Sequence, residues 1–163
     1  MPLSRRTVNV LTLIIVLILL AFIGIFMASE RSINQAKQET VRLVEVDHDV
    51  KKVNKFYWLT TTEATYFSLD YQNEENKQSY AIVARDGGDV HYFSPQDIIS
   101  EADAKAITVA NNEDNLKDIV AVRLGLLDGQ PVWEITFKTK EATMTYYYIN
   151  AKNGQNIQVI SNL

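Results

Sequence analysis

Four carboxylate pairs are the residues of this chain whose types and spacing come nearest to catalytic chemistry. Acid–base catalysis needs two carboxyl groups near one substrate, with pKa values that their surroundings hold apart. These pairs lie in polar segments or beside turns, where no apolar side chains are expected to exclude water. We therefore predict that they form solvated surface; an extracytoplasmic hydrolase that uses them stays an alternative that measured turnover would support. The pairs are Asp47/Asp49, Glu74/Glu75, Asp86/Asp89 and Glu113/Asp114.

The histidines and the absence of cysteine limit the chemistry further. His48 stands between Asp47 and Asp49, an arrangement that also occurs in metal sites and oriented bases, but no second histidine is near it in sequence. We predict a surface position for His48, and expect His91 to face solvent or a loop. Without cysteine, thiolate catalysis and cysteine-based zinc or iron–sulfur sites are excluded. The sequence predicts no enzymatic activity, no metal and no cofactor.

Aromatic side chains form the predicted binding surface. Side chains alternate between the two faces of a strand, which puts Phe56 and Trp58 on one face and Tyr57 on the other. A sheet covered by a helix on one side is not expected to bury both faces, so some rings must meet solvent, another part of the chain or a partner. Tyr and Trp are frequent anchors at interfaces, while a place in the core remains the alternative for each ring. The predicted partner-binding residues are Phe56, Tyr57, Trp58, Tyr146, Tyr147 and Tyr148.

A charge-free run of 19 residues, Val10–Ala28, predicts a membrane anchor over residues 10–28. As a helix it is roughly 28 Å long, close to the hydrocarbon core of a bilayer at about 30 Å. The alternative is a cleaved signal peptide, but its apolar region is usually shorter, and no Ala-x-Ala cleavage site follows this run. Arg5 and Arg6 precede the run. The positive-inside rule therefore puts residues 1–9 in the cytoplasm and the chain after about residue 30 outside the cell membrane.

The charge balance limits the partners. The 163 residues include 16 Lys and Arg against 20 Asp and Glu, a formal net charge of -4. Since Arg5 and Arg6 lie before the apolar run, the part expected outside is more acidic still. Nucleic acid binding requires clustered basic residues and is excluded. No small-molecule substrate is evident from the residues present.

Beyond the anchor, the residue pattern predicts helix, sheet, helix and sheet. Residues 30–46 have helical spacing without Gly or Pro. Ser100 and Asp103 form a capping box that starts a second helix. We expect one side of that helix to be formed by Ala102, Ala106 and Val109. Aromatic and β-branched runs predict strands at 55–61, 64–71, 79–85, 89–93, 119–126, 131–138, 143–150 and 157–160.

The chain contains an internal repeat. The segment from Tyr80 to Ser94 aligns without gaps on the segment from Tyr147 to Ser161, with five identical residues, and each copy follows a helix and a hairpin. The sequence therefore predicts two α+β units, residues 30–94 and 95–163, each a helix on an antiparallel sheet. Because units this small have thin cores, we expect the two to pack together.

The second half resembles a PepSY domain. The resemblance rests on the Ala-rich helix from Ile99 to Ile107, the strand Val132-Trp-Glu-Ile-Thr-Phe137, and the strand and turn from Tyr146 to Gly154. Asn150 and Asn153 stand where that family usually has Asp and Thr, which leaves the turn intact because Asn-Gly forms it well. With its basic tail, single anchor and duplicated unit, the whole chain resembles the YpmB/TseB-like family of Gram-positive bacteria.

The resemblance implies a cystatin-like α+β fold on the outer face of the cell membrane. It also implies a non-enzymatic adaptor in cell-wall elongation, which would regulate peptidoglycan synthesis by contacting a class B penicillin-binding protein. The alternative is a peptide-binding or peptidase-inhibitory PepSY module, since an exposed sheet edge can accept a peptide strand.

Overall fold

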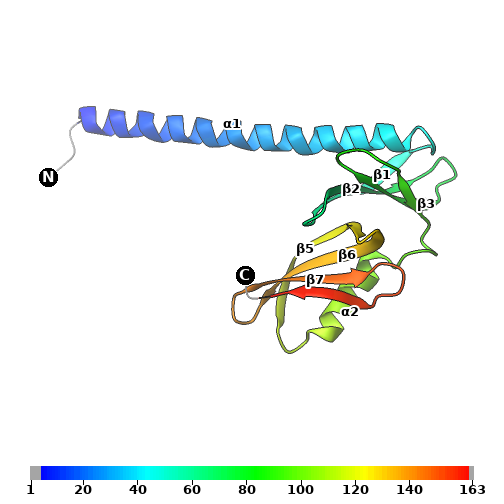
Figure 1. The fold of residues 1–163 in the computed structure, drawn as a ribbon. Coiled ribbons are helices and arrows are strands. Elements are labelled where there is room, and N and C mark those ends of the chain that lie inside the picture. Colours follow the sequence, from blue (N-terminus) through cyan, green and yellow to red (C-terminus); the bar gives the residue numbers. More distant parts are fainter. Residues whose placement is uncertain (1–4, 162–163) are drawn as a thin grey trace. The chain divides into compact units, whose positions relative to one another are not determined.

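The computed structural model describes the backbone of residues 5–161 and the side chains of residues 11–25 and 31–161. The chain divides into two compact units at Gln38/Glu39. The first unit is helical, and the second carries two antiparallel four-stranded sheets and a second helix (Figure 1). The predicted α+β class with two sheets is confirmed.

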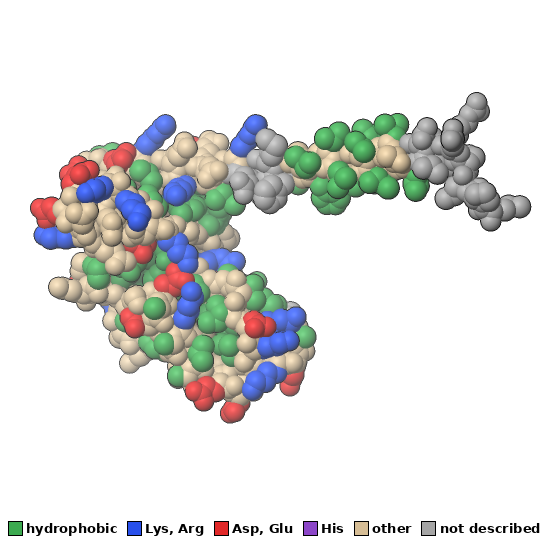
Figure 2. Space-filling model, turned by 180° about the vertical axis from the view of Figure 1, so that it is seen from behind, with side chains coloured by type: hydrophobic (Ala, Val, Ile, Leu, Met, Phe, Trp, Pro, Cys, Tyr) green, Lys and Arg blue, Asp and Glu red, His purple; other side chains and the backbone are tan. Residues whose placement is uncertain are grey.

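Helix α1 runs from Arg5 to Val44. Its large apolar side chains between Leu11 and Ile25 are 44 to 69% exposed, and apolar side chains surround this part of the helix (Figure 2). Among the described residues, no helix meets the length and hydropathy needed to cross a membrane. The predicted anchor at 10–28 extends at both ends beyond the described side chains, and the predicted tail at 1–9 lies outside them. Both stay predictions.

The first sheet consists of β1 (Lys52–Thr60), β2 (Thr65–Gln72), β3 (Gln78–Ala84) and β4 (His91–Phe93), antiparallel and in that order. Its strands are rich in aromatic and β-branched residues, which fit a pleated, half-buried surface. One face packs on the last turn of α1 through Val44, in a cluster with Leu69, Tyr71, Ala81 and Val83. The helix-on-sheet arrangement predicted for the first half is present.

The second sheet consists of β5 (Leu116–Leu127), β6 (Gln130–Thr139), β7 (Met144–Asn150) and β8 (Asn156–Ile160), again antiparallel and in that order. Asp128 and Gly129 connect β5 to β6, both with positive φ, as a tight two-residue hairpin turn requires. Strand β8 is exposed along its whole length and forms one edge of the sheet.

Helix α2 (Glu101–Asn111) begins with the predicted capping box, in which the Asp103 amide donates to Ser100 Oγ at 3.1 Å. Ala102, Ala106 and Val109 form one side of the helix, and this side is exposed. The side buried against the sheet is formed by Ala104 and Thr108. Thr108 reaches the core because its hydroxyl donates to the Ala104 carbonyl at 2.9 Å, which satisfies the polar group inside the helix.

A single core joins the two sheets and α2, as predicted. Trp133 lies fully buried at its centre, with Tyr57 and Tyr80 from the first sheet packed edge-on against its ring at 5.3 and 6.4 Å. Its indole N–H donates to the Ile99 carbonyl at 3.0 Å, so the one polar atom of this side chain is satisfied. Each sheet therefore completes the core of the other.

Gly125 of β5 lies directly against the Leu59 side chain of β1. A Cβ at this position would stand 2.5 Å from Leu59 Cδ2, a distance that only glycine tolerates. Beside it, Ser68 Oγ donates to the Leu124 carbonyl at 2.8 Å in a buried bond. Strand β1 therefore covers the face of the second sheet that α2 leaves open.

The two sheets share one plan. The difference in residue number between Tyr80 and Tyr147 also relates β1 to β5, β3 to β7 and the end of α1 to the end of α2. The β1–β2 turn is longer than the β5–β6 turn. The difference in residue number between corresponding positions of β2 and β6 is therefore not the same as for the other strands. The pairing of Trp58 with Phe67 corresponds to that of Gly125 with Val132. The boundary predicted near residue 95 falls between β4 and α2.

Candidate functional site

An open pocket of about 430 Å³ lies where β1 meets the face of the second sheet opposite α2. It brings together Trp58 and Tyr146, two of the predicted binding residues, from β1 and β7. Both rings are half-exposed, and Trp58 packs edge-on against Phe67 at 5.0 Å. The remaining lining residues are Thr60, Arg123 and Glu134. The pocket therefore has aromatic walls around an ion pair.

The ion pair of the pocket is held by a closed hydrogen-bond network. Glu134 is only 3% exposed, and its Oε1 accepts from Arg123 Nη1 at 2.5 Å and from Thr136 Oγ1 at 3.1 Å. Its Oε2 accepts from the Tyr148 hydroxyl at 2.7 Å. Burial and this bond to the carboxylate raise the pKa of Tyr148, so the phenol stays a donor. The network fixes Arg123 in place.

Of the other predicted binding residues, Phe56 is half-exposed and lies on the same side of β1 as Trp58. Three tyrosines are buried, with at most 6% of their surface exposed: Tyr57, Tyr147 and Tyr148. Tyr148 meets another part of the chain, which is one of the three environments expected for these rings, because Leu59 of the first half packs beside it. Buried rings offer little area to a partner. Of the three half-exposed rings, Trp58 and Tyr146 line the pocket and can contact a partner there, whereas Phe56 does not line it.

Arg123, Glu134 and Thr60 were not predicted as site residues. Their signal is present in the sequence, because Arg123 and Glu134 are single opposite charges inside two apolar strands. A charge inside a buried strand needs a partner, and adjacent strands supply one across the ladder. Identifying the pair requires the strand register, which places Arg123 directly opposite Glu134.

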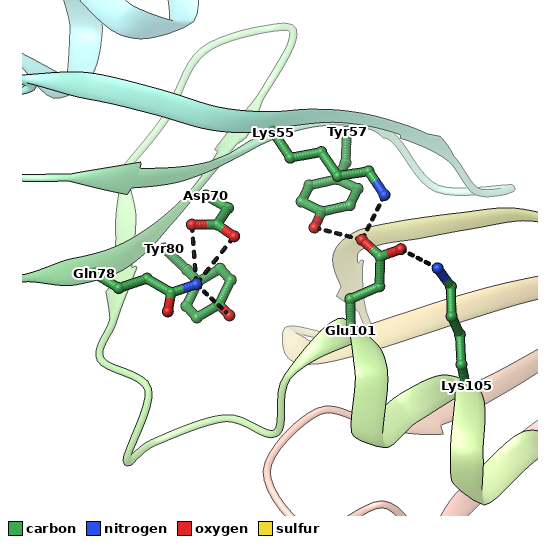
Figure 3. A network of polar contacts seen from close by, with 7 residues as sticks. All are labelled: Lys55, Tyr57, Asp70, Gln78, Tyr80, Glu101 and Lys105. Carbon is green, nitrogen blue, oxygen red and sulfur yellow. Dashed lines mark hydrogen bonds and ion pairs between the residues drawn. The ribbon is translucent and has the colours of Figure 1, made fainter.

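A second polar network ties β1 to the start of α2 (Figure 3). Glu101 Oε2 accepts from Lys55 Nζ at 2.5 Å and from the Tyr57 hydroxyl at 2.9 Å, and Oε1 pairs with Lys105 Nζ at 2.6 Å. Burial opposes ionisation of Glu101, but the bonds from Lys105, Lys55 and Tyr57 outweigh it and lower its pKa. For Tyr57, burial and the adjacent Glu101 raise the pKa. The arrangement fastens the two halves to each other.

This network predicts a loss of stability in acid. A carboxyl whose folded-state pKa is lowered contributes stability above its ordinary pKa of 4.5, and this is lost as the pH falls through the folded value. We expect Glu101→Gln to lower the melting temperature at neutral pH and to flatten its fall below about pH 4.5. Thermal unfolding followed by circular dichroism measures both. The matched control is Glu113→Gln at an exposed carboxylate, and equal pH profiles for Glu101→Gln and the wild type would refute the assignment.

The four predicted carboxylate pairs are all exposed, which confirms that they form surface. Asp47, Asp49, Glu74 and Glu75 line one open pocket of about 290 Å³ together with His48 and Lys77. The exposed ring of His48 lies 4.0 Å from that of Tyr92, centroid to centroid, and His91 is exposed too, as predicted. Over the part of the chain that the structure describes, no group of three or more His, Asp or Glu is arranged to hold a metal.

The comparisons with known proteins agree with this architecture. Residues 98–159 match the PepSY family, described as the peptidase propeptide and YPEB domain. The solved structure of the YpmB protein from Bacillus subtilis superposes with a TM-score of 0.64 over 76% of this chain and 96% of that one, at 18% identity. At this identity the likeness shows the fold alone. No curated protein matches the chain with significance.

Proposed function

We propose that this protein is a non-enzymatic, membrane-anchored adaptor outside the cytoplasm. The proposal starts from its PepSY domain at residues 98–159 and its YpmB-like fold. The protein acts by contacting a class B penicillin-binding protein and so regulates cell-wall elongation. The observation that carries the binding role is the pocket in which Trp58 and Tyr146 meet over the Arg123–Glu134 pair. Half-exposed aromatic rings beside a fixed arginine are the residue types that dominate binding energy at interfaces.

The anchor is part of the proposed mechanism. The exposed apolar side chains from Leu11 to Ile25 form a large unbroken apolar surface, which is unfavourable in water and favourable in lipid. The basic residues Arg5 and Arg6 before it support an orientation with the sheets outside the cytoplasm. Tethering two proteins in one membrane raises their effective concentration, so a weak contact at the pocket suffices.

The partner class rests on the resemblance to the YpmB/TseB-like family, and photo-crosslinking tests it. Thr60 is exposed and lines the pocket, so it is the position for a benzoylphenylalanine side chain in the full chain, kept in native membranes. We expect ultraviolet light to join the chain to a protein that also carries a fluorescent penicillin. The adduct should fall at least severalfold when Trp58→Ala or Tyr146→Ala is added.

Asp86 provides the matched crosslinking control. It is equally exposed but does not line the pocket, so the same crosslinker there should give no penicillin-labelled adduct. Adducts of equal yield from Asp86 and Thr60 would show proximity in the membrane without a specific contact. Adducts that carry no penicillin label would rule out the proposed partner class.

A peptide-binding or peptidase-inhibitory role is the second candidate, and β8 favours it. This strand is an edge, it is uncharged, and Ile157 and Val159 are exposed on it. Its free backbone groups can pair with an extended peptide, the mode called β-augmentation. Crosslinking from Ile157 to a secreted protease, together with inhibition of that protease by the full chain, would favour this role over the adaptor.

A further inference from the structure

We infer that the Trp58–Tyr146 pocket binds an extended, proline-containing segment of a protein. This rests on the proposed binding function and names the chemistry of what is bound. Three properties of the pocket carry it: an excess of hydrogen-bond donors, cancelling charges, and two aromatic walls.

The charged acceptor of the pocket is already used. Glu134 is the only carboxylate among the described residues that line it, and its oxygens accept from Arg123, Thr136 and Tyr148. Being 3% exposed, this carboxylate has almost no surface left for a ligand. A ligand rich in donors would therefore lose hydrogen bonds to water without regaining them, which is costly.

The donors of the pocket are not used up. Arg123 donates to Glu134 and Thr136 through Nη1 alone, and for the described residues its Nε and Nη2 have no protein acceptor. The indole N–H of Trp58 likewise has no acceptor among the described residues, whereas that of Trp133 is bonded. The Arg123 side chain is 36% exposed and lines the pocket, so a ligand can reach it. The pocket calls for a ligand that supplies acceptors.

The charges of the pocket favour a neutral ligand. Arg123 and Glu134 form a pair at 2.5 Å, and no other ionisable Lys, Arg, Asp or Glu lines the pocket among the described residues. An anionic ligand bonded to Arg123 would also face the buried charge of Glu134 behind it. Neutral carbonyl oxygens are acceptors without that repulsion.

Proline residues meet all three conditions. A proline in a chain has a carbonyl acceptor but no N–H donor, and its ring presents a flat apolar face. Proline-rich segments adopt an extended helix without internal hydrogen bonds, so their carbonyls stay free, and they bind in aromatic-lined grooves. Trp58 and Tyr146 supply the aromatic walls, and Trp58, Arg123 and Thr60 supply the donors. A glycan also packs on aromatic rings, but its many hydroxyl donors would find no free carboxylate here, because the oxygens of Glu134 already accept from Arg123, Thr136 and Tyr148.

The test is isothermal titration of the full chain in detergent micelles with a decaproline peptide. We expect saturable binding, and a loss of affinity of about tenfold or more for Trp58→Ala and for Tyr146→Ala. Phe56→Ala is the matched control, because Phe56 is half-exposed on the same side of β1 and packs against Phe67, yet does not line the pocket. It should keep the affinity. Circular dichroism melts confirm that each variant is folded.

Fluorescence adds an independent measurement. The chain has two tryptophans, and Trp133 is fully buried, so a change of emission on adding the peptide reports Trp58. Two other ligands are titrated in the same way as comparisons: a Gly-Ser peptide of the same length and a chito-oligosaccharide. Neither should bind comparably.

The proposal is overturned if decaproline does not bind at millimolar concentration, if either comparison probe binds as well, or if Phe56→Ala weakens binding as much as Trp58→Ala. These results are separate from the crosslinking result. A penicillin-labelled adduct at Thr60 without decaproline binding would keep the adaptor and reject the proline ligand, while decaproline binding without that adduct would do the reverse.

Discussion

Replacing Arg123 with Met is expected to lower the free energy of unfolding by about 3–5 kcal/mol, because it leaves a buried carboxylate without its cation. Glu134 is 3% exposed, and its remaining partners, the hydroxyls of Thr136 and Tyr148, carry no charge. Urea unfolding of the full chain followed by circular dichroism measures the change.

The double variant Arg123→Met/Glu134→Gln separates burial of a charge from loss of packing. The amide oxygen of Gln still accepts from one of the two hydroxyls, and its NH2 group donates to the other, so most of the lost stability should return. Arg85 provides the surface comparison, because its pair with Asp86 is more than half exposed on both sides. Arg85→Met should change stability by less than about 1 kcal/mol. Similar losses for Arg123→Met and Arg85→Met would contradict the role given to the buried pair.

Trp133→Ala is the second large effect, with an expected loss of about 3–5 kcal/mol. The ring is fully buried where both sheets and α2 meet, and Tyr57 and Tyr80 pack against it. Truncation leaves a cavity that these rings cannot fill, and it frees the Ile99 carbonyl of its donor. The midpoint of urea unfolding measures the loss.

Trp58→Ala is the matched comparison, because it deletes the same side chain where it is half-exposed. It should cost clearly less than Trp133→Ala, since less apolar area returns to water. An unchanged urea midpoint for Trp133→Ala would show that the shared core does not depend on this ring. Equal losses for both variants would show that Trp58 is structural and not available to a partner.

Local features of the fold were predictable from the sequence. The capping box of Ser100 and Asp103 depends on neighbouring residues and forms as predicted. The Asp128-Gly129 turn likewise depends on residues that are adjacent in the sequence. The strands follow from runs of β-branched and aromatic residues, and the repeat follows from matched segments such as those that begin at Tyr80 and Tyr147. Burial of Trp133 follows from its place in the strand of a helix-covered sheet.

The candidate site was predictable only in part, because it depends on how distant strands pack. Trp58 and Tyr146 were identified by residue type, but nothing local shows that they share a pocket. The burial of Tyr148 depends on Leu59, which comes from the other half of the chain. The side of α2 that packs could not be identified from the sequence, because a helix of small residues has two sides almost equally suited to packing. The sheet beneath the helix determines that Ala104 and Thr108 are the buried residues.

The contact of Leu59 with Gly125 gives the duplicated halves a direction. By strand register the counterpart of Gly125 is Trp58, the bulkiest residue in place of the smallest. One half therefore carries the protruding Leu59 and the other the vacancy at Gly125, so this contact distinguishes the two halves of the repeat. A side chain as large as Trp58 at position 125 would block the same contact, which makes the pairing of the halves directional.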